Sequence, residues 1–171
     1  MTDAGSGDLE RQALLEFLEA QRASVLAIVE GLGEEALRTP AVPSGWTPLG
    51  LLKHLGFAER HWFQRVAAGS VTELPWTEVA GEEEDARPYT TGLPADVVFA
   101  FYRDQCQRAN AMLASTPLSS PPRGRHPGDT AGEVSDLRWI VLHIIEETAR
   151  HAGHLDIARE LIDGQTGLGP R

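Results

Sequence analysis

Apolar residues recur at the helical spacing of three and four in four separate segments of this 171-residue chain. None of these segments shows the alternation of apolar and polar residues that is typical of a half-buried strand. Such a chain buries its apolar stripes by packing helix against helix. The pattern therefore predicts an all-α fold, a four-helix bundle.

Capping and breaking residues mark the ends of the first two predicted helices. We expect the first helix over residues 8–31, where Gly31 and Gly33 can adopt the left-handed conformation that ends a helix. Thr47 is the predicted N-cap of a second helix over residues 48–68, which begins with a proline and is followed by a glycine.

The third and fourth helices are bounded in the same way. The third is expected over residues 94–116, between two prolines. The fourth is expected to begin near Glu133 or Ser135 and to end at about Asp163, with Gly164 behind it. It would be the longest helix of the bundle.

Long connections join the predicted helices. Residues 70–93 include the acidic run 82–85, and residues 115–132 contain four prolines. Long loops in a compact bundle often cover a site, and ordinary crossover geometry explains them equally well. We expect the chain to form one domain, residues 1–171, with an ordered core over about residues 8–164.

Charge and cysteine content exclude several functions. The chain has 25 acidic residues against 15 Lys and Arg, a formal net charge of -10, which repels the phosphates of nucleic acid. No stretch has the apolar length of a membrane span, and the N-terminus lacks the order of a signal peptide. The single cysteine, Cys106, cannot form an internal disulfide. We therefore expect a cytoplasmic protein that binds neither nucleic acid nor membrane.

The predicted fourth helix carries polar groups in its apolar stripe. His151 occupies a position that packing alone would give to Leu or Ile, and Glu147 lies four residues earlier on the same face. His54, one turn into the second predicted helix, is the best candidate for a third ligand. Two histidines, one carboxylate and an open position make a catalytic type of zinc site. The same donor set also accepts nickel, iron or manganese.

Other interpretations of the histidines stay open. His54 taken alone is also explained as a partly buried, hydrogen-bonded histidine. His61 shares its helix face but lies about 10 Å along the axis, too far to bind the same ion. His151 and His154, three residues apart, form a rival ligand pair. His126 lies in a loop rich in Pro, Arg and Gly, where we expect it to be exposed to solvent.

A histidine on the second predicted helix is followed, on the last one, by Glu-x-x-x-His and then Ala-Gly. This order resembles the DinB-like metal-binding bundle superfamily, and more closely its actinobacterial branch of mycothiol-dependent transferases and isomerases. The specific likeness lies in residues 44–63, 137–156 and 159–167. The resemblance implies a DinB-like bundle whose metal triad is His54, Glu147 and His151.

The same resemblance implies a divalent metal, Zn²⁺ in the first place with Ni²⁺ or another divalent ion as alternatives, and a mycothiol-type thiol as co-substrate. Many relatives have His where this chain has Glu147, and Glu is what the mycothiol branch uses. His154 stands where relatives often carry Gln, so we expect it beside the ligands or facing the substrate. His61 is a second candidate for contact with the thiol.

We therefore predict a metal-dependent thiol S-transferase in which the metal activates the thiol as nucleophile toward a small electrophile. Cys106, on the apolar stripe of the third predicted helix, is expected to be a core residue rather than the nucleophile. A metal-dependent hydrolase or isomerase on the same triad is the main alternative. A non-enzymatic stress protein with a structural metal is another. The expected partners are the small-molecule thiol and electrophile. A second copy of the chain, in a homodimer, is a further possible partner.

Overall fold

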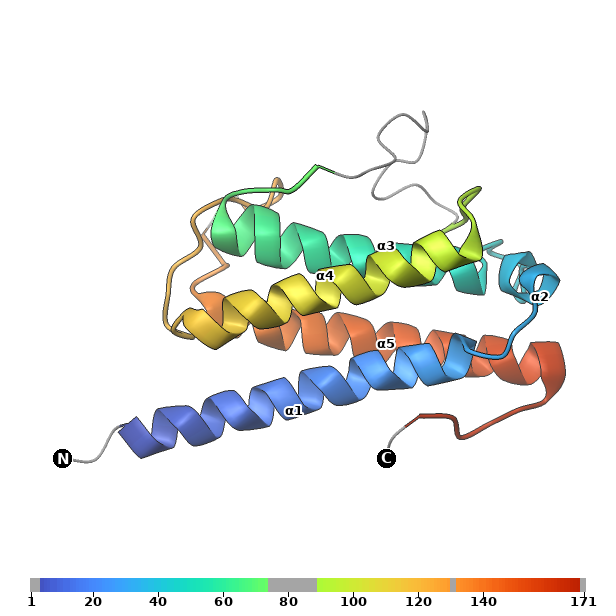
Figure 1. Cartoon of the computed structure of the whole chain (residues 1–171), viewed down its shortest axis with the longest axis horizontal. Coiled ribbons are helices and arrows are strands. Elements are labelled where there is room, and N and C mark those ends of the chain that lie inside the picture. The colour runs from blue at the N-terminus through green and yellow to red at the C-terminus, as the bar shows by residue number, and fades with distance from the viewer. Residues whose placement is uncertain (1–3, 74–88, 130–131, 170–171) are drawn as a thin grey trace.

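Helices make up 66% of the part of the chain that the structure describes, and the predicted all-α bundle is confirmed. The computed structural model describes residues 4–73, 89–129 and 132–169, and no strand occurs among them (Figure 1). The elements are α1 (Ala4–Val29), α2 (Glu34–Arg38), α3 (Pro48–Glu59), η1 (Arg60–Ala68), α4 (Ala95–Ser115) and α5 (Leu137–Asp163).

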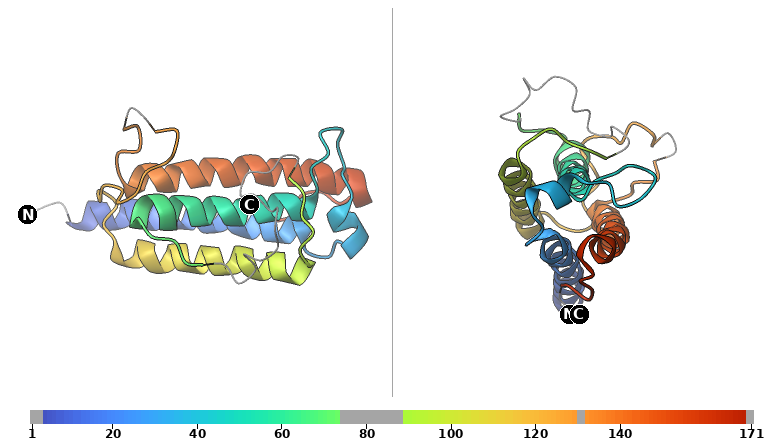
Figure 2. Two further views of the ribbon diagram at one scale, coloured as in Figure 1. Left: turned by 90° about the horizontal axis from the view of Figure 1, so that it is seen from above. Right: turned by 90° about the vertical axis from the view of Figure 1, so that its right-hand side faces the viewer.

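The long elements run alongside one another, with η1 continuing α3 (Figure 2). Helix α1 packs mainly on α5, and α3 packs mainly on α4. Gly56 allows the close packing of α3 on α4, because a Cβ at this position would lie 2.6 Å from the ring of Phe101 on α4. Two apolar clusters fill the interior, one toward α2 that includes Leu52 and Leu155, and one toward the other end that includes Phe63 and Ile144.

Caps explain where the helices begin and end. The Thr47 hydroxyl accepts a hydrogen bond from Gly50 N (3.1 Å), as predicted for the start of α3. Gly164 ends α5 with a φ of 77°, in the left-handed region, also as predicted. The start of α5 was predicted too early. The helix begins at Leu137, because the Asp136 carboxylate caps it by accepting from Trp139 N (3.0 Å).

Three other boundaries differ from the prediction. Helix α1 spans Ala4–Val29 rather than residues 8–31. The short helix α2 lies where a loop was expected. The second predicted helix changes type at Glu59, after which η1 is a π-helix with wider, i to i+5 hydrogen bonding. The period of the apolar residues therefore does not fix where the side chains of η1 point.

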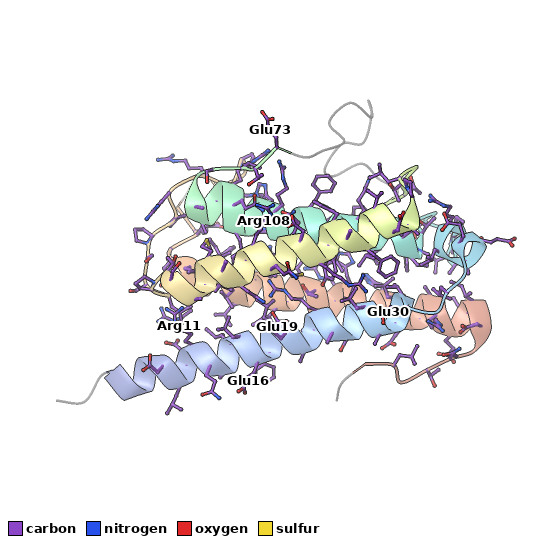
Figure 3. All side chains as sticks on the ribbon, viewed as in Figure 1. Arg11, Glu16, Glu19, Glu30, Glu73 and Arg108 are labelled. Atoms are coloured by element: carbon purple, nitrogen blue, oxygen red, sulfur yellow. The ribbon has the colours of Figure 1, made fainter. Side chains whose placement is uncertain are left out.

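Two arginines tie helix ends together across the bundle. Arg11 on α1 donates to the carbonyl oxygens of Leu113 and Thr116 at the C-terminal end of α4 (Figure 3). Arg159 on α5, which is buried, donates to the carbonyl oxygen of Glu30 just after α1 (3.0 Å). Both guanidinium groups therefore bind carbonyl groups at or just after the C-terminal end of a helix, where the helix itself supplies no donor.

The predicted acidic run, residues 82–85, lies outside the described residues. In the described part of the chain, no helix combines the length and the apolar character that crossing a bilayer requires.

Candidate metal centre

His54, Glu147 and His151 place three potential ligand atoms within 4.8 Å of one another. The Nε2 atom of His54 lies 3.2 Å from Oε1 of Glu147, and Nε2 of His151 lies 3.0 Å from the same oxygen. Two helices supply the group, α3 for His54 and α5 for the other two residues. The structure thus brings together the three residues that the sequence singled out as a metal triad.

The donor set suits a divalent ion. Two imidazole nitrogens and one carboxylate oxygen converge on a common point, and these are ligand types that Zn²⁺ and several other divalent metals accept. His151 is 5% exposed, whereas His54 and Glu147 are half-buried, so the group lies at the edge of the core. A ligand could therefore reach the donors from one side.

Glu147 is held as a carboxylate by its neighbours. Hydrogen bonds from His151 and then from His54 lower the pKa of Glu147 well below its usual value, against the opposing effect of burial. The positive charge of Arg150 acts in the same direction, with Nη2 lying 2.6 Å from Oε2 of Glu147. The carboxylate is therefore ionised at neutral pH, as a metal ligand must be.

His54 is packed under the ring of Tyr89. The two rings stack with centroids 4.2 Å apart and an angle of 24°. The backbone around Tyr89 lies against the start of α3, where Thr47 N donates to the Tyr89 carbonyl oxygen (2.9 Å). Only glycine fits at position 50, because a Cβ there would lie 2.1 Å from that oxygen. Tyr89 was not among the predicted site residues, because it belongs to a connection and has no helical spacing relative to the triad.

His154 lies behind the triad. Its Nδ1 atom is 3.2 Å from Nδ1 of His151, on the side of the ring away from Glu147. His154 does not belong to the three-donor group, so the rival pairing of His151 with His154 is less well supported by the geometry than the triad. Burial and the neighbouring His151 lower the pKa of His154.

A pocket of about 630 Å³ opens beside the triad. His54 and Glu147 line one part of it, and it continues along α3 and η1. Its other lining residues are Phe57, Ala58, His61, Trp62, Arg65, His126, Pro127, His143 and Arg150. This volume is in the range of sites that bind small molecules.

The expectation that His126 is exposed to solvent is wrong. His126 is half-buried, and its ring stacks on Trp62 with centroids 4.9 Å apart and an angle of 17°. Its Nδ1 atom lies 2.9 Å from Nε2 of His61. Composition suggested an exposed loop, whereas the loop folds back onto η1. His61 lies outside the three-donor group and lines the same pocket.

Cys106 lies away from the pocket and packs against the apolar cluster near α2. Burial raises the pKa of its thiol far above the usual value, with a further contribution from the nearby Glu59 carboxylate. A thiol of this kind is a poor nucleophile, because the thiolate is the reactive form.

Residues 13–164 match the family model described as Mycothiol-S-transferase. The comparison with curated proteins found no match. The matched span includes His54, Glu147, His151 and the residues that line the pocket. The chain belongs to the mycothiol-S-transferase family.

Proposed function

We propose that the protein is a metal-dependent S-transferase that joins a mycothiol-type thiol to a small electrophile. The observation that carries the proposal is the convergence of three metal-donor atoms beside a small-molecule pocket, in a chain of the mycothiol-S-transferase family. The family supports the thiol as substrate, and the donor set supports a metal that activates it.

In this proposal His54, Glu147 and His151 hold the ion, and the substrates enter through the pocket. A divalent ion held there would lower the pKa of a thiol bound to it, so that the thiol would react as the nucleophilic thiolate at neutral pH. Two of the three donor side chains have neighbours outside the triad that hold their orientation. Arg150 contacts the second oxygen of Glu147, and Tyr89 covers the ring of His54.

A catalytic rather than a structural metal is favoured by the number of donors. Structural zinc sites usually close with four protein ligands, whereas catalytic sites keep a position for substrate. In the described part of the chain the donor group has three members, and His154 approaches the far nitrogen of His151 instead of the common point. We infer Zn²⁺ as the ion, and Ni²⁺, Fe²⁺ or Mn²⁺ would accept the same donors.

We also propose that the protein is located in the cytoplasm. The single cysteine is a free thiol, as is usual in a reducing compartment, where low-molecular-weight thiols are also available as substrates.

Thiol conjugation by the purified protein tests the proposal. The protein, loaded with one equivalent of Zn²⁺, is incubated with mycothiol, glutathione or cysteine and a panel of chromogenic electrophiles. We expect metal-dependent consumption of the thiol with a preference for mycothiol, and no such activity in the His151→Ala variant. If no thiol reacts faster with the wild-type protein than with this variant, the proposed transferase function is wrong.

A further inference from the structure

We propose that His61 and His126 form a proton-transfer pair in the pocket beside the metal triad. In this pair His61 is the catalytic acid–base group, and His126 is the residue that positions it. The inference rests on the proposed transferase function, because it assigns the group that carries a proton in that reaction. Both residues line the same pocket as His54 and Glu147.

The two imidazoles are close enough to share a proton. Nε2 of His61 lies 2.9 Å from Nδ1 of His126, and the rings meet edge to face with an angle of 89°. A hydrogen bond between two neutral imidazoles needs one ring to donate its N–H and the other to accept it. When the pair takes up a further proton, the acceptor can become charged and the bond becomes charge-assisted, which stabilises the added proton.

The loop that carries His126 is fixed onto the end of η1. Gly124 N donates to Val66 O (2.8 Å), and Arg123 N donates to Ala67 O (3.1 Å). Only glycine allows this docking, because a Cβ at position 124 would lie 2.0 Å from the carbonyl oxygen of Arg65. The backbone of the loop therefore holds His126 next to His61.

Trp62 fixes the second histidine further. Its ring stacks on the ring of His126 and also contacts His143 on α5, with centroids 4.5 Å apart. His143 in turn stacks on Trp139 at 5.3 Å, so it is held within an aromatic stack on α5. Among the described residues of this pocket, the imidazole–imidazole hydrogen bond joins His61 to His126, so we assign the proton transfer to these two residues.

The surroundings of His126 favour its neutral form at neutral pH. Burial lowers the pKa of His126, His61 lowers it further, and Asp129 in the same loop acts in the opposite direction. The other titratable or charged side chains that face this pocket are His54 from α3, Arg65 from η1, and His143, Glu147 and Arg150 from α5.

The reaction leaves a proton to be moved. The thiol loses its proton as it becomes the thiolate, and the sulfur electron pair forms the new bond to the electrophile. The electron pair of the bond that breaks passes to an atom of the electrophile, and that atom then needs a proton. His61 accepts the proton from the thiol side and delivers it to this atom, so no further reactant is required.

Histidine NMR titrations of the metal-free protein give a test that does not depend on turnover. We expect His61→Gln, which keeps a polar atom near the Nε2 position but cannot titrate, to raise the apparent pKa of His126, because the neighbouring His61 lowers it. The pKa of His154, at the other side of the triad, should stay unchanged. Equal His126 titrations in the wild-type and His61→Gln proteins would show two independent histidines and overturn the pair.

The pH dependence of kcat/KM tests the catalytic roles. His61→Gln should lower kcat/KM by about 100-fold and remove one limb of the pH profile, while the metal content stays unchanged. His126→Ala should lower it by about tenfold, and His126→Asn should restore most of the rate but not the pH profile. A wild-type rate and profile in His61→Gln would refute its role.

The two proposals fail in different ways. If the wild-type protein transfers no thiol, the proposed function is wrong, and the NMR titration still decides whether His61 and His126 form a coupled pair. If transfer occurs and His61→Gln matches the wild type, the function stands and the pair is wrong.

Discussion

Nη2 of Arg150 lies 2.6 Å from Oε2 of Glu147, whereas the two histidines of the triad approach the other oxygen, Oε1. The carboxylate is thus held from both sides, with one oxygen occupied by an arginine and the other left for the metal. Arg150 is separated from Glu147 by less than one helical turn, so α5 itself fixes the pairing.

Replacing Arg150 by Gln should weaken metal binding by about tenfold, because the carboxylate loses the contact that orients it. Competition with a metal indicator measures the affinity. Arg103→Gln is the matched control, since Arg103 forms a similar ion pair with Glu30 (2.7 Å) on the surface of the bundle. Equal metal affinities in the two variants would show that Arg150 does not support Glu147.

Replacing His151 by Ala should remove the bound metal and leave the bundle folded. The side chain is one of three donors, and the loss of one of them leaves too few ligands for tight binding. Elemental analysis gives the metal content, and circular dichroism reports the helices. Full metal occupancy in this variant would exclude His151 as a ligand.

The stability of the metal-free protein should depend on Glu147 in acid. Its pKa in the folded protein is below the usual value of 4.5, so the unfolded chain binds the proton more readily. The stabilisation from this carboxylate is therefore present above about pH 4.5 and is lost as the pH falls through the lower folded pKa.

Chemical denaturation of the wild-type and Glu147→Gln proteins between pH 7 and pH 3 measures this effect. The difference between their free energies of unfolding should be largest near neutral pH and should shrink below about pH 4.5. A difference that stays constant over the whole range would mean that the ionised form of Glu147 is not favoured by folding.

The buried ion pair between Arg22 and Glu59 should contribute more to the free energy of unfolding than any surface ion pair does. Two hydrogen bonds of 2.7 and 2.6 Å join the side chains, and both residues are 2% exposed. Arg22→Met should lower the free energy of unfolding by about 3–5 kcal/mol, because it leaves the Glu59 charge buried without its partner. The double replacement by Met and Leu should recover much of this loss.

The exposed pair between Arg103 and Glu30 provides the control for that experiment. Its side chains are 48% and 55% exposed, and removing it should change the free energy of unfolding by less than about 1 kcal/mol. Denaturant titrations measure both pairs. If Arg22→Met changed the free energy of unfolding as little as removing the exposed pair does, water would have to reach Glu59 when the arginine is removed.

Replacing Cys106 by Ala should leave thiol transfer largely intact. The thiol packs against the apolar cluster near α2, and burial keeps its pKa far above the neutral range. Steady-state rates of conjugation, compared with those of His61→Gln, check this expectation. An inactive Cys106→Ala protein with a full metal content would make the cysteine the nucleophile.

The sequence predicted the long helices because their signals are local. Apolar spacing, Thr47 as an N-cap and Gly164 as a left-handed cap act within a few residues of one another. The predicted helix boundaries were wrong where another local contact set the helix end. Asp136, for example, caps α5 later than expected. The change to a π-helix after Glu59 has no comparable local signal, and Glu59 itself pairs with Arg22 of another helix.

The sequence by itself determined which side chains could bind a metal, because ligand chemistry and helical spacing are properties of the residues and of the helix. Glu147 and His151 share a face of any helix that contains them both. Only the tertiary structure decided that His54 meets them, that Tyr89 covers His54, and that His126 reaches His61. These contacts join residues far apart in the chain, and the packing of helices and the path of two connections determine them.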